Sequence, residues 1–206
     1  MKNYLGHLTL LIILSAVLLD FPAPYGFAVF TDVTKESGIH TVTYSGSQEK
    51  KHLLESVGCG TAFLDYNRDG NQDIYIVNGW KIEDKHVMVK GKNALYRNIG
   101  NGTFEEVTEQ AKVGDNSWGI GVCTTDYNND GWIDIYVTNF GANRLYRNNQ
   151  DGTFTDVATR VGVNDKRWSV GASFLDFDKD GDLDLYVVNY VTSSIQEVLE
   201  AKLSQD

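Results

Sequence analysis

Apolar and polar residues alternate in short segments that recur along most of the chain, and this period of two predicts β-strands. Three pairs of segments share one layout. A strand that begins with glycine is followed, after a polar loop, by a second strand rich in β-branched residues and tyrosine. The first strands cover residues 60–64, 121–125 and 171–175, and the second strands cover residues 74–78, 135–139 and 185–189.

Two of the three pairs continue into a hairpin. Its first strand reads Asn-x-Leu-Tyr-Arg-Asn at residues 93–98 and 143–148. The turn that follows holds Asn101-Gly102 or Asp151-Gly152, pairs that favour tight hairpins. Four antiparallel strands in a repeat of about 50 residues predict an all-β fold, a partial β-propeller built from four-stranded blades. A β-sandwich is the alternative, and the fixed period argues against it.

Two positions break the period. Asn93 and Asn143 are 50 residues apart, but Asp65 and Asp126 are 61 apart, so residues 79–92 hold an insertion. A second insertion is expected within residues 41–54. Insertions in a repeat map to loops, often on the binding face. Residues 79–92 carry four lysines in an acidic chain and are the predicted partner surface, with a longer solvated hairpin as the alternative.

Both ends of the repeat array, residues 29–190, depart from the pattern. Residues 30–34 copy the last strand of a blade, so we expect a leading outer strand there, before two full blades and a partial third. Residues 191–206 are predicted to be an amphipathic helical tail, because Ser194 and Glu197 form a capping box. Ile195, Val198, Leu199 and Leu203 then follow at helical spacing.

The tail is an insertion, a cap for the array or the end of a fragment. An open blade edge is exposed to pairing with another chain. We therefore expect a fragment, a helix-capped array or self-association through the open edge.

Residues 1–28 are predicted to be a secretory signal peptide. Lys2 precedes an apolar run over residues 8–19, which is shorter than the roughly 20 residues that span a bilayer. Pro22 and Pro24 follow, with a plausible cleavage site after Ala28. The expected location is secreted and extracellular, or periplasmic or cell-surface in a bacterium. No membrane span is expected after signal removal, and a retained membrane anchor is the alternative.

The polar loop between the first two strands occurs three times as Asp-x-[Asp/Asn]-x-Asp-Gly-x-x-Asp. Oxygen-bearing side chains at positions 1, 3, 5 and 9, with the main-chain carbonyl of position 7, suit Ca²⁺, which takes six to eight oxygen ligands. An EF-hand shares this spacing but needs a glutamate at position 12, where this chain has Ile76, Val137 and Val187. Three acidic turns without metal are the other alternative.

Three Ca²⁺ sites are therefore expected. The predicted ligands are Asp65, Asn67, Asp69, Asn71 and Asp73 in loop 1 (residues 65–73), Asp126, Asn128, Asp130, Trp132 and Asp134 in loop 2 (residues 126–134), and Asp176, Asp178, Asp180, Asp182 and Asp184 in loop 3 (residues 176–184).

The charge of the chain has a local origin in these loops. The 206 residues carry a net charge of −10, and the loops hold 11 of the 28 acidic residues. Three Ca²⁺ ions would bring the formal charge to about −4. No basic stripe is visible, which argues against nucleic acid as a partner. Cys59 and Cys123 are expected on opposite faces of their strands and unpaired.

The loop resembles the FG-GAP/VCBS-type repeats of integrin α-subunit propellers. Phe-Thr-Asp-Val-Thr, Asp-Tyr-Asn-x-Asp-Gly, Tyr-Val-x-Asn and Asn-x-Leu-Tyr-Arg-Asn look more narrowly like the N-terminal part of cartilage acidic protein and its ASPIC/UnbV-type bacterial relatives. This resemblance covers residues 30–190. It implies a calcium-binding secreted propeller and the ligand sets given above. The later blades and the following domain of those proteins have no counterpart here.

No catalytic constellation accompanies the repeats. His40, His52 and His86 lie in irregular or inserted stretches, and nucleophile-elbow and phosphate-loop motifs are absent from the sequence. We predict a non-enzymatic extracellular module in which Ca²⁺ rigidifies the blade loops and the surface binds a protein or a glycan. The alternative is part of a calcium-dependent carbohydrate-active enzyme or a lectin propeller, with Trp118, Trp132 and Trp168 stacking on sugars rather than packing between blades.

Overall fold

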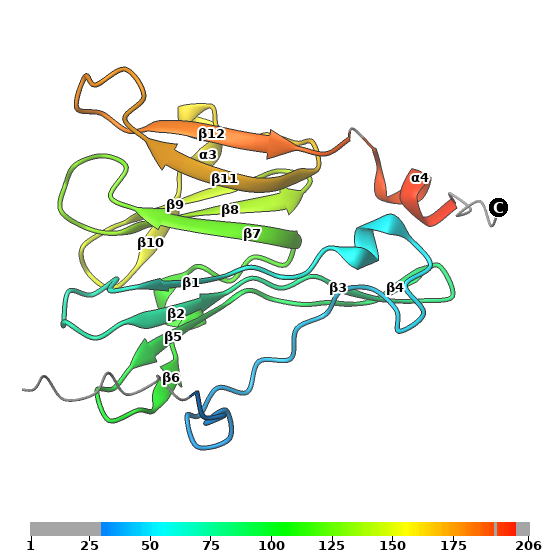
Figure 1. Cartoon of the computed structure of the whole chain (residues 1–206), viewed down its shortest axis with the longest axis horizontal. Helices are drawn as coiled ribbons and strands as arrows, with labels where there is room; N and C mark the ends of the chain where they lie inside the picture. Colours follow the sequence, from blue (N-terminus) through cyan, green and yellow to red (C-terminus); the bar gives the residue numbers. More distant parts are fainter. Residues whose placement is uncertain (1–29, 192, 201–206) are drawn as a thin grey trace, which may run out of the picture. The chain divides into compact units, whose positions relative to one another are not determined.

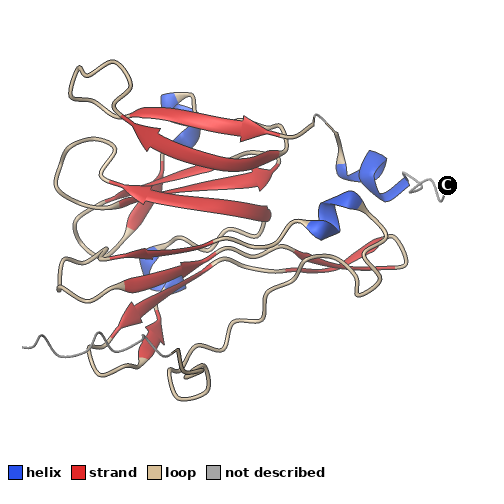
Figure 2. Cartoon of the chain, in the orientation of Figure 1, coloured by secondary structure: helices blue, strands red, loops and turns tan. Residues whose placement is uncertain are grey.

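The computed structural model describes residues 30–191 and 193–200. The predicted signal peptide and Leu203 lie outside these residues. The chain divides into two units, residues 1–33 and residues 34–206. The second unit consists of short antiparallel strands with a few single helical turns (Figure 1, Figure 2). None of the described helices is long and apolar enough to cross a membrane.

Two complete blades confirm the predicted all-β, propeller-like architecture. The first sheet has the order β1 (Thr61–Leu64), β2 (Asp73–Ile76), β5 (Ala94–Asn98), β6 (Phe104–Glu106). The second sheet has the order β7 (Trp118–Thr125), β8 (Asp134–Phe140), β9 (Arg144–Asn148), β10 (Phe154–Asp156). The register repeats as well, since Ile74 pairs with Tyr96 in the first sheet and Ile135 pairs with Tyr146 in the second.

The third sheet contains two strands, β11 (Ser169–Leu175) and β12 (Asp184–Asn189). Its strands pair in the register of β7 with β8, including a bulge near the start of the first strand. This bulge follows the tryptophans that precede the second and third glycine-headed strands, Trp118 and Trp168.

Apolar side chains fill the space between successive sheets. Leu64, Tyr75 and Val77 from the first sheet share one buried cluster with Ile135 and Val137 from the second. On the opposite face of the second sheet, a cluster around Tyr136 and Leu145 takes in Phe174, Leu185 and Val187 of the third. Side chains on one face of the second sheet therefore pack against the preceding sheet, and side chains on its other face pack against the following sheet.

Gly60, the first glycine of its repeat, allows the inner strands of the first two sheets to approach closely. A Cβ on Gly60 would lie 3.0 Å from Gly121 Cα and 3.1 Å from Val122 N. At Gly171, the same repeat position, no heavy atom of the described residues lies within 4 Å of such a Cβ. The close packing at Gly60 thus depends on the following sheet.

Gly60→Ala is expected to lower the free energy of unfolding by about 1–3 kcal/mol, because backbone atoms would have to shift to admit the methyl group. Gly171→Ala is the matched control and should change the free energy of unfolding by less than about 0.5 kcal/mol. Urea denaturation measures both. Equal costs would mean that the glycine serves the local strand conformation rather than the contact between sheets.

Short helical turns follow both outer strands, and the sequence pattern did not predict them. These are α2 (Thr108–Ala111) and α3 (Ala158–Val161). Each ends in a left-handed residue, Lys112 with φ 60° and Gly162 with φ 81°. They carry the chain from the outer edge of one blade towards the inner strand of the next.

The predicted outer strand at residues 30–34 is wrong. No strand forms over these residues, and Phe30 and Val33 are exposed. An outer strand pairs with the third strand of a blade, and in the described residues β5 and β9 already pair with β6 and β10. The sequence of residues 30–34 matches an outer strand, but the described sheets offer no free third strand to pair with it.

Both insertions form structure at the same end of the sheets (Figure 1). Residues 79–92 contain the hairpin of β3 (Trp80–Glu83) and β4 (His86–Lys90), and residues 41–54 lead into the 3₁₀ turn η1 (Leu53–Ser56). The two insertions are bonded to each other, since Gly46 N donates to Trp80 O at 2.7 Å.

The helix α4 (Ile195–Glu200) lies within the predicted tail. Its capping box forms: Glu197 N donates to Ser194 Oγ at 3.2 Å, and Ser194 N donates to Glu197 Oε2 at 2.6 Å. Val198 joins a buried cluster with Trp118 and Trp168. Burial of these two indoles between elements favours the packing role for them over sugar stacking. Ile195 and Leu199 of the helix are half-buried against the same cluster.

Both cysteines are free and half-buried. Cys59 Sγ donates to Tyr44 O at 3.3 Å, whereas Cys123 packs beside the Tyr136 cluster. Burial raises the pKa of the Cys123 thiol to about 11. Neither thiol is therefore activated as a nucleophile.

Candidate metal centre

The three repeated loops lie at one end of the sheets, on the left in Figure 1, opposite the two insertions. Loop 1 joins β1 to β2, loop 2 joins β7 to β8 and loop 3 joins β11 to β12. Each loop connects the first two strands of its sheet in the same direction, so the repeat itself brings the three loops to one end.

The backbone of the loops repeats closely. Position 4 is left-handed in all three, with φ of 58° at Arg68, 57° at Asn129 and 64° at Lys179. Position 6 is glycine with φ of 85°, 87° and 94°. A Cβ on Gly70 or Gly181 would meet no described atom within 4 Å. Glycine is required there for its backbone angle and not for space.

The aspartate at position 1 organises the turn by accepting main-chain hydrogen bonds. Asp65 accepts from Asp69 N at 3.1 Å and from Gly70 N at 3.0 Å. Asp126 repeats both bonds, at 3.0 Å and 2.6 Å. Asp176 accepts from Gly181 N at 3.2 Å. These bonds hold the carboxylates inside the turn.

Positions 3, 5 and 7 are also linked within each loop. The Oδ1 atom of position 5 accepts from the main-chain N of position 7, at 2.8 Å from Asn71, 3.0 Å from Trp132 and 2.9 Å from Asp182. In loops 1 and 2 the asparagine amide at position 3 donates to position 5, from Asn67 to Asp69 and from Asn128 to Asp130. The loop main chain and the amide hold the pKa of Asp69 below its ordinary value.

The aspartate at position 9 ties the loop to the rest of its blade. Asp73 accepts from Tyr66 N at 3.2 Å and from Asn98 N at 2.8 Å. Asp134 makes the same pair of bonds, from Tyr127 N at 3.2 Å and from Asn148 N at 2.7 Å. The main-chain N–H of the last asparagine in Asn-x-Leu-Tyr-Arg-Asn thus closes loops 1 and 2.

The sequence pattern placed Asn98 and Asn148 in a repeated motif but predicted no role for them in the site. The recurrence of that motif after 50 residues, next to loops that are 61 residues apart, was the available signal.

Burial favours the protonated form of the position-9 carboxylates when no positive charge lies beside them. Both are almost completely buried, and desolvation raises the pKa of Asp73 and of Asp134 to about 6. The main-chain donors lower the pKa and do not offset the burial. A cation in the loop would favour the ionised form of these carboxylates.

Loop 3 differs because its sheet has no described third strand. Asp184 is exposed and accepts from Phe177 N at 2.9 Å. Carboxylate oxygens of Asp176, Asp178 and Asp184 lie within 4.8 Å of one another. Asp176 Oδ1 is buried with no hydrogen-bond partner. An unpartnered buried oxygen beside two other carboxylates fits a hard cation that takes oxygen ligands.

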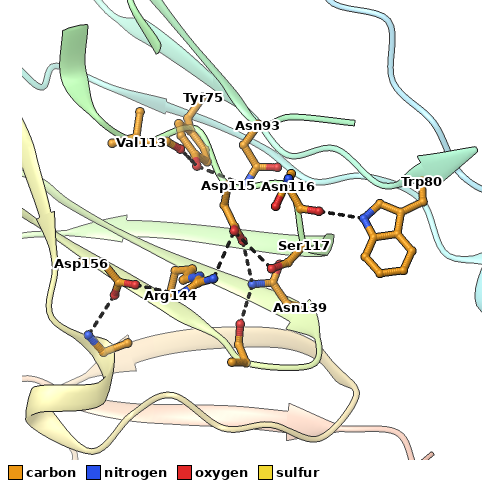
Figure 3. Close-up of polar contacts among 12 residues, drawn as sticks. Tyr75, Trp80, Asn93, Val113, Asp115, Asn116, Ser117, Asn139, Arg144 and Asp156 are labelled. Atoms are coloured by element: carbon orange, nitrogen blue, oxygen red, sulfur yellow. Dashed lines mark hydrogen bonds and ion pairs between the residues drawn. The ribbon is translucent and has the colours of Figure 1, made fainter. Parts of the chain in front are cut away.

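A polar network crosses between the first two sheets at the level of Asp115 (Figure 3). Its carboxylate accepts from Ser117 Oγ at 3.2 Å, from Arg144 Nη2 at 3.3 Å and from Asn139 Nδ2 at 3.4 Å. Asp115 O accepts from Asn93 N at 2.9 Å. The residue joins the connection after α2 to both neighbouring blades.

The network repeats 50 residues later. Asp165 O accepts from Asn143 N at 2.9 Å, and its carboxylate accepts from Asn189 Nδ2 at 2.9 Å. Hydrogen bonds from Arg167 hold the pKa of Asp165 well below its ordinary value. We attribute to this pair a structural role between blades, away from the loops, and the sequence pattern had not singled it out.

The chain was compared with known families. The family described as FG-GAP-like repeat matches residues 65–137 and residues 126–187, so each matched range runs from one loop to the strand that follows the next loop. Comparison with curated proteins finds no significant match. The family covers more than half of the chain and includes all three loops. The chain therefore belongs to the FG-GAP-like repeat family.

Proposed function

We propose that the three loops bind Ca²⁺ and that the chain is a non-enzymatic, secreted interaction module. The observation that carries this proposal is the threefold repetition of one donor arrangement, with an unpartnered buried oxygen at Asp176. Bound calcium would supply positive charge that neutralises the clustered carboxylates and crosslinks them. The chain itself holds those carboxylates in place through main-chain donors.

The fifteen predicted ligand positions keep their assigned roles in this proposal. Side chains at positions 1, 3, 5 and 9 and the main-chain carbonyl at position 7 would be the ligands in each loop. The narrower relation to cartilage acidic protein and its ASPIC/UnbV-type relatives is also proposed, on the motifs around the loops. Export would place the loops in an environment where calcium sites of roughly 0.1–1 mM suffice.

Calcium titration calorimetry tests the metal proposal. The chain is expected to bind three ions, and Asp130→Ala should remove or weaken at least tenfold the site in loop 2, because position 5 is both a ligand and the acceptor for Trp132 N. Asp151→Ala is the control, since Asp151 is an exposed aspartate in the turn before β10. An unchanged titration for Asp130→Ala would exclude this ligand assignment, and no binding at millimolar calcium would exclude the sites altogether.

The insertions are the proposed binding surface for an extracellular protein or glycan. Residues 43–52 and 81–85 line an open cleft of about 1600 Å³. Strand β3 is structural, since Ile82 is buried and the ring centroids of Trp80 and Trp118 lie 5.8 Å apart. Strand β4 exposes His86 and Met88. Partner contacts are therefore assigned to β4.

The third sheet is a proposed surface for self-association. Phe174 packs edge-on against Tyr136 of the preceding sheet with ring centroids 6.1 Å apart. Phe63 has the repeat position of Phe174 in the first sheet, and Tyr186 has the repeat position of Tyr136 in the third sheet. Neither has a neighbouring sheet to pack against in the described residues, and they are 65% and 73% exposed. Another copy of the chain can supply the missing half of this contact in each case.

Two substitutions test these surfaces and serve as controls for each other. Tyr186→Ser should lower the mass measured by light scattering at high protein concentration and leave binding to immobilised glycans unchanged. Met88→Ser should weaken glycan binding and leave the mass unchanged. A monomeric wild-type chain at all concentrations would contradict self-association, and equal glycan binding by both variants would contradict the hairpin assignment for glycans.

A further inference from the structure

Side chains at position 4 of two loops reach across to the following loop. The Arg68 guanidinium of loop 1 lies over the Trp132 ring of loop 2, 5.4 Å from the ring centroid. Its Nη1 atom is also the nearest atom to a Cβ built on Gly131, at 3.7 Å. Arginine stacked on an indole gains both cation–π and planar contact.

The second crossing contact uses different chemistry at the same position. Asn129 is position 4 of loop 2, and its Nδ2 atom donates to Gly181 O at 3.2 Å and to Asp182 Oδ1 at 3.3 Å in loop 3. Both contacts therefore run from position 4 of one loop to positions 6 and 7 of the next. A stacking pair and a hydrogen-bonded pair thus occupy equivalent places.

The contacted residue matters to the site of its own loop. Trp132 and Asp182 are position 7, where the main-chain carbonyl is a proposed ligand. Their main-chain N atoms donate to the position-5 carboxylates of Asp130 and Asp180 at 3.0 Å and 2.9 Å. Position 4 therefore touches the residue that fixes two ligands of the following loop.

All three position-4 residues have φ near 60°, and position 4 supplies no proposed ligand. Lys179, position 4 of loop 3, makes no hydrogen bond, ion pair or ring contact to another loop within the described part of the chain. The series therefore has two links, from loop 1 to loop 2 and from loop 2 to loop 3.

We propose that the loops are coupled in series through position 4, so that occupation of one calcium site favours occupation of its neighbour. This inference rests on the proposed calcium binding. Ordering of a loop fixes its position-4 side chain, which restrains position 7 of the next loop before that loop is filled. Linkage requires the effect to be reciprocal, so filling loop 3 also favours filling loop 2.

Asn129→Gly is the direct test because glycine keeps the left-handed backbone and removes the amide. Calcium affinity at loop 3 is expected to fall about fivefold or more, the lower range of a typical coupling between sites. Hydrogen exchange of the amides of residues 176–184 at partial calcium saturation should become faster, although no residue of loop 3 is changed. Exchange in residues 65–73 is the internal comparison and should change least, because loop 1 is linked to loop 3 only through loop 2.

Lys179→Gly is the matched control variant, since it makes the same backbone replacement at a position 4 without a crossing contact. It should leave exchange in loop 2 unchanged. Arg68→Lys tests the other link independently, because lysine keeps the charge and loses the planar stacking. This substitution should make hydrogen exchange of the loop 2 amides faster at partial calcium saturation.

The outcomes distinguish the coupling between loops from the calcium binding on which it depends. Three calcium ions bound by wild type and by Asn129→Gly, with equal affinity and equal exchange in loop 3, would overturn the coupling and leave the calcium proposal intact. A wild-type chain that binds no calcium would overturn both.

Discussion

Chelation of calcium is expected to lower the melting temperature of the chain by about 20 °C. At free calcium about 100 times the dissociation constant, one occupied site adds about 2.7 kcal/mol to the free energy of unfolding, and three sites at the same saturation add about 8 kcal/mol. In a chain of this size, 1 kcal/mol corresponds to roughly 2–4 °C. Scanning calorimetry with calcium and with excess chelator measures the difference.

The metal-free loops explain why the effect should be this large. Asp73 and Asp134 are buried, and their pKa of about 6 lies above the ordinary value for aspartate. Folding without metal therefore takes up protons, and the metal-free chain loses stability as pH rises through 6. The difference between calcium and chelator should be larger at pH 7 than at pH 5, where protons also compete with calcium.

A variant without the position-5 carboxylates supplies the control for chelation. Asp69, Asp130 and Asp180 are exposed, so their joint replacement by alanine removes a proposed ligand from each loop with little loss of core packing. Its melting temperature should respond only weakly to chelator. A wild-type melting temperature that is the same in calcium and in chelator would contradict a stabilising role for the ion.

The repeated parts of the fold were predictable because each strand carries a local pattern. Tyr75 and Tyr136 occupy the same register in two sheets, and the alternation around them fixes which side chains face the following sheet. The spacing of the loop glycines likewise predicted a turn, and Gly70 and Gly131 have the required backbone angle. These features depend on near neighbours in the sequence, so a single sequence reveals them.

Contacts between repeats were harder to predict. Asp115 meets Asn139 and Arg144 from the following blade, and Arg68 meets Trp132 across two loops. Their spacing in the sequence has no local signature, since it depends on how successive blades stack. The prediction of an outer strand at residues 30–34 was wrong for the same reason. The sequence of these residues suits an outer strand, but pairing depends on a segment far away in the chain.

The position-9 aspartate combines a local motif with such a distant contact, and Asp134→Ala is expected to lower the free energy of unfolding in calcium by about 5 kcal/mol. Asp134 is 2% exposed and accepts main-chain bonds from Tyr127 and Asn148. Alanine leaves both donors without this acceptor, at a cost of about 1–3 kcal/mol for a buried group. Loss of calcium at loop 2 adds about 2.7 kcal/mol under the saturation given above.

Asp184→Ala separates these two contributions. Asp184 holds the same motif position, is exposed and accepts one described main-chain bond, from Phe177. Its replacement should cost about 3 kcal/mol in calcium, mainly through the lost ion, and little in chelator. Denaturant unfolding of both variants should therefore differ by about 2 kcal/mol, the contribution of the bridge to Asn148. Equal losses would show that the lost ion, rather than the lost link to the hairpin, accounts for the destabilisation in a complete blade.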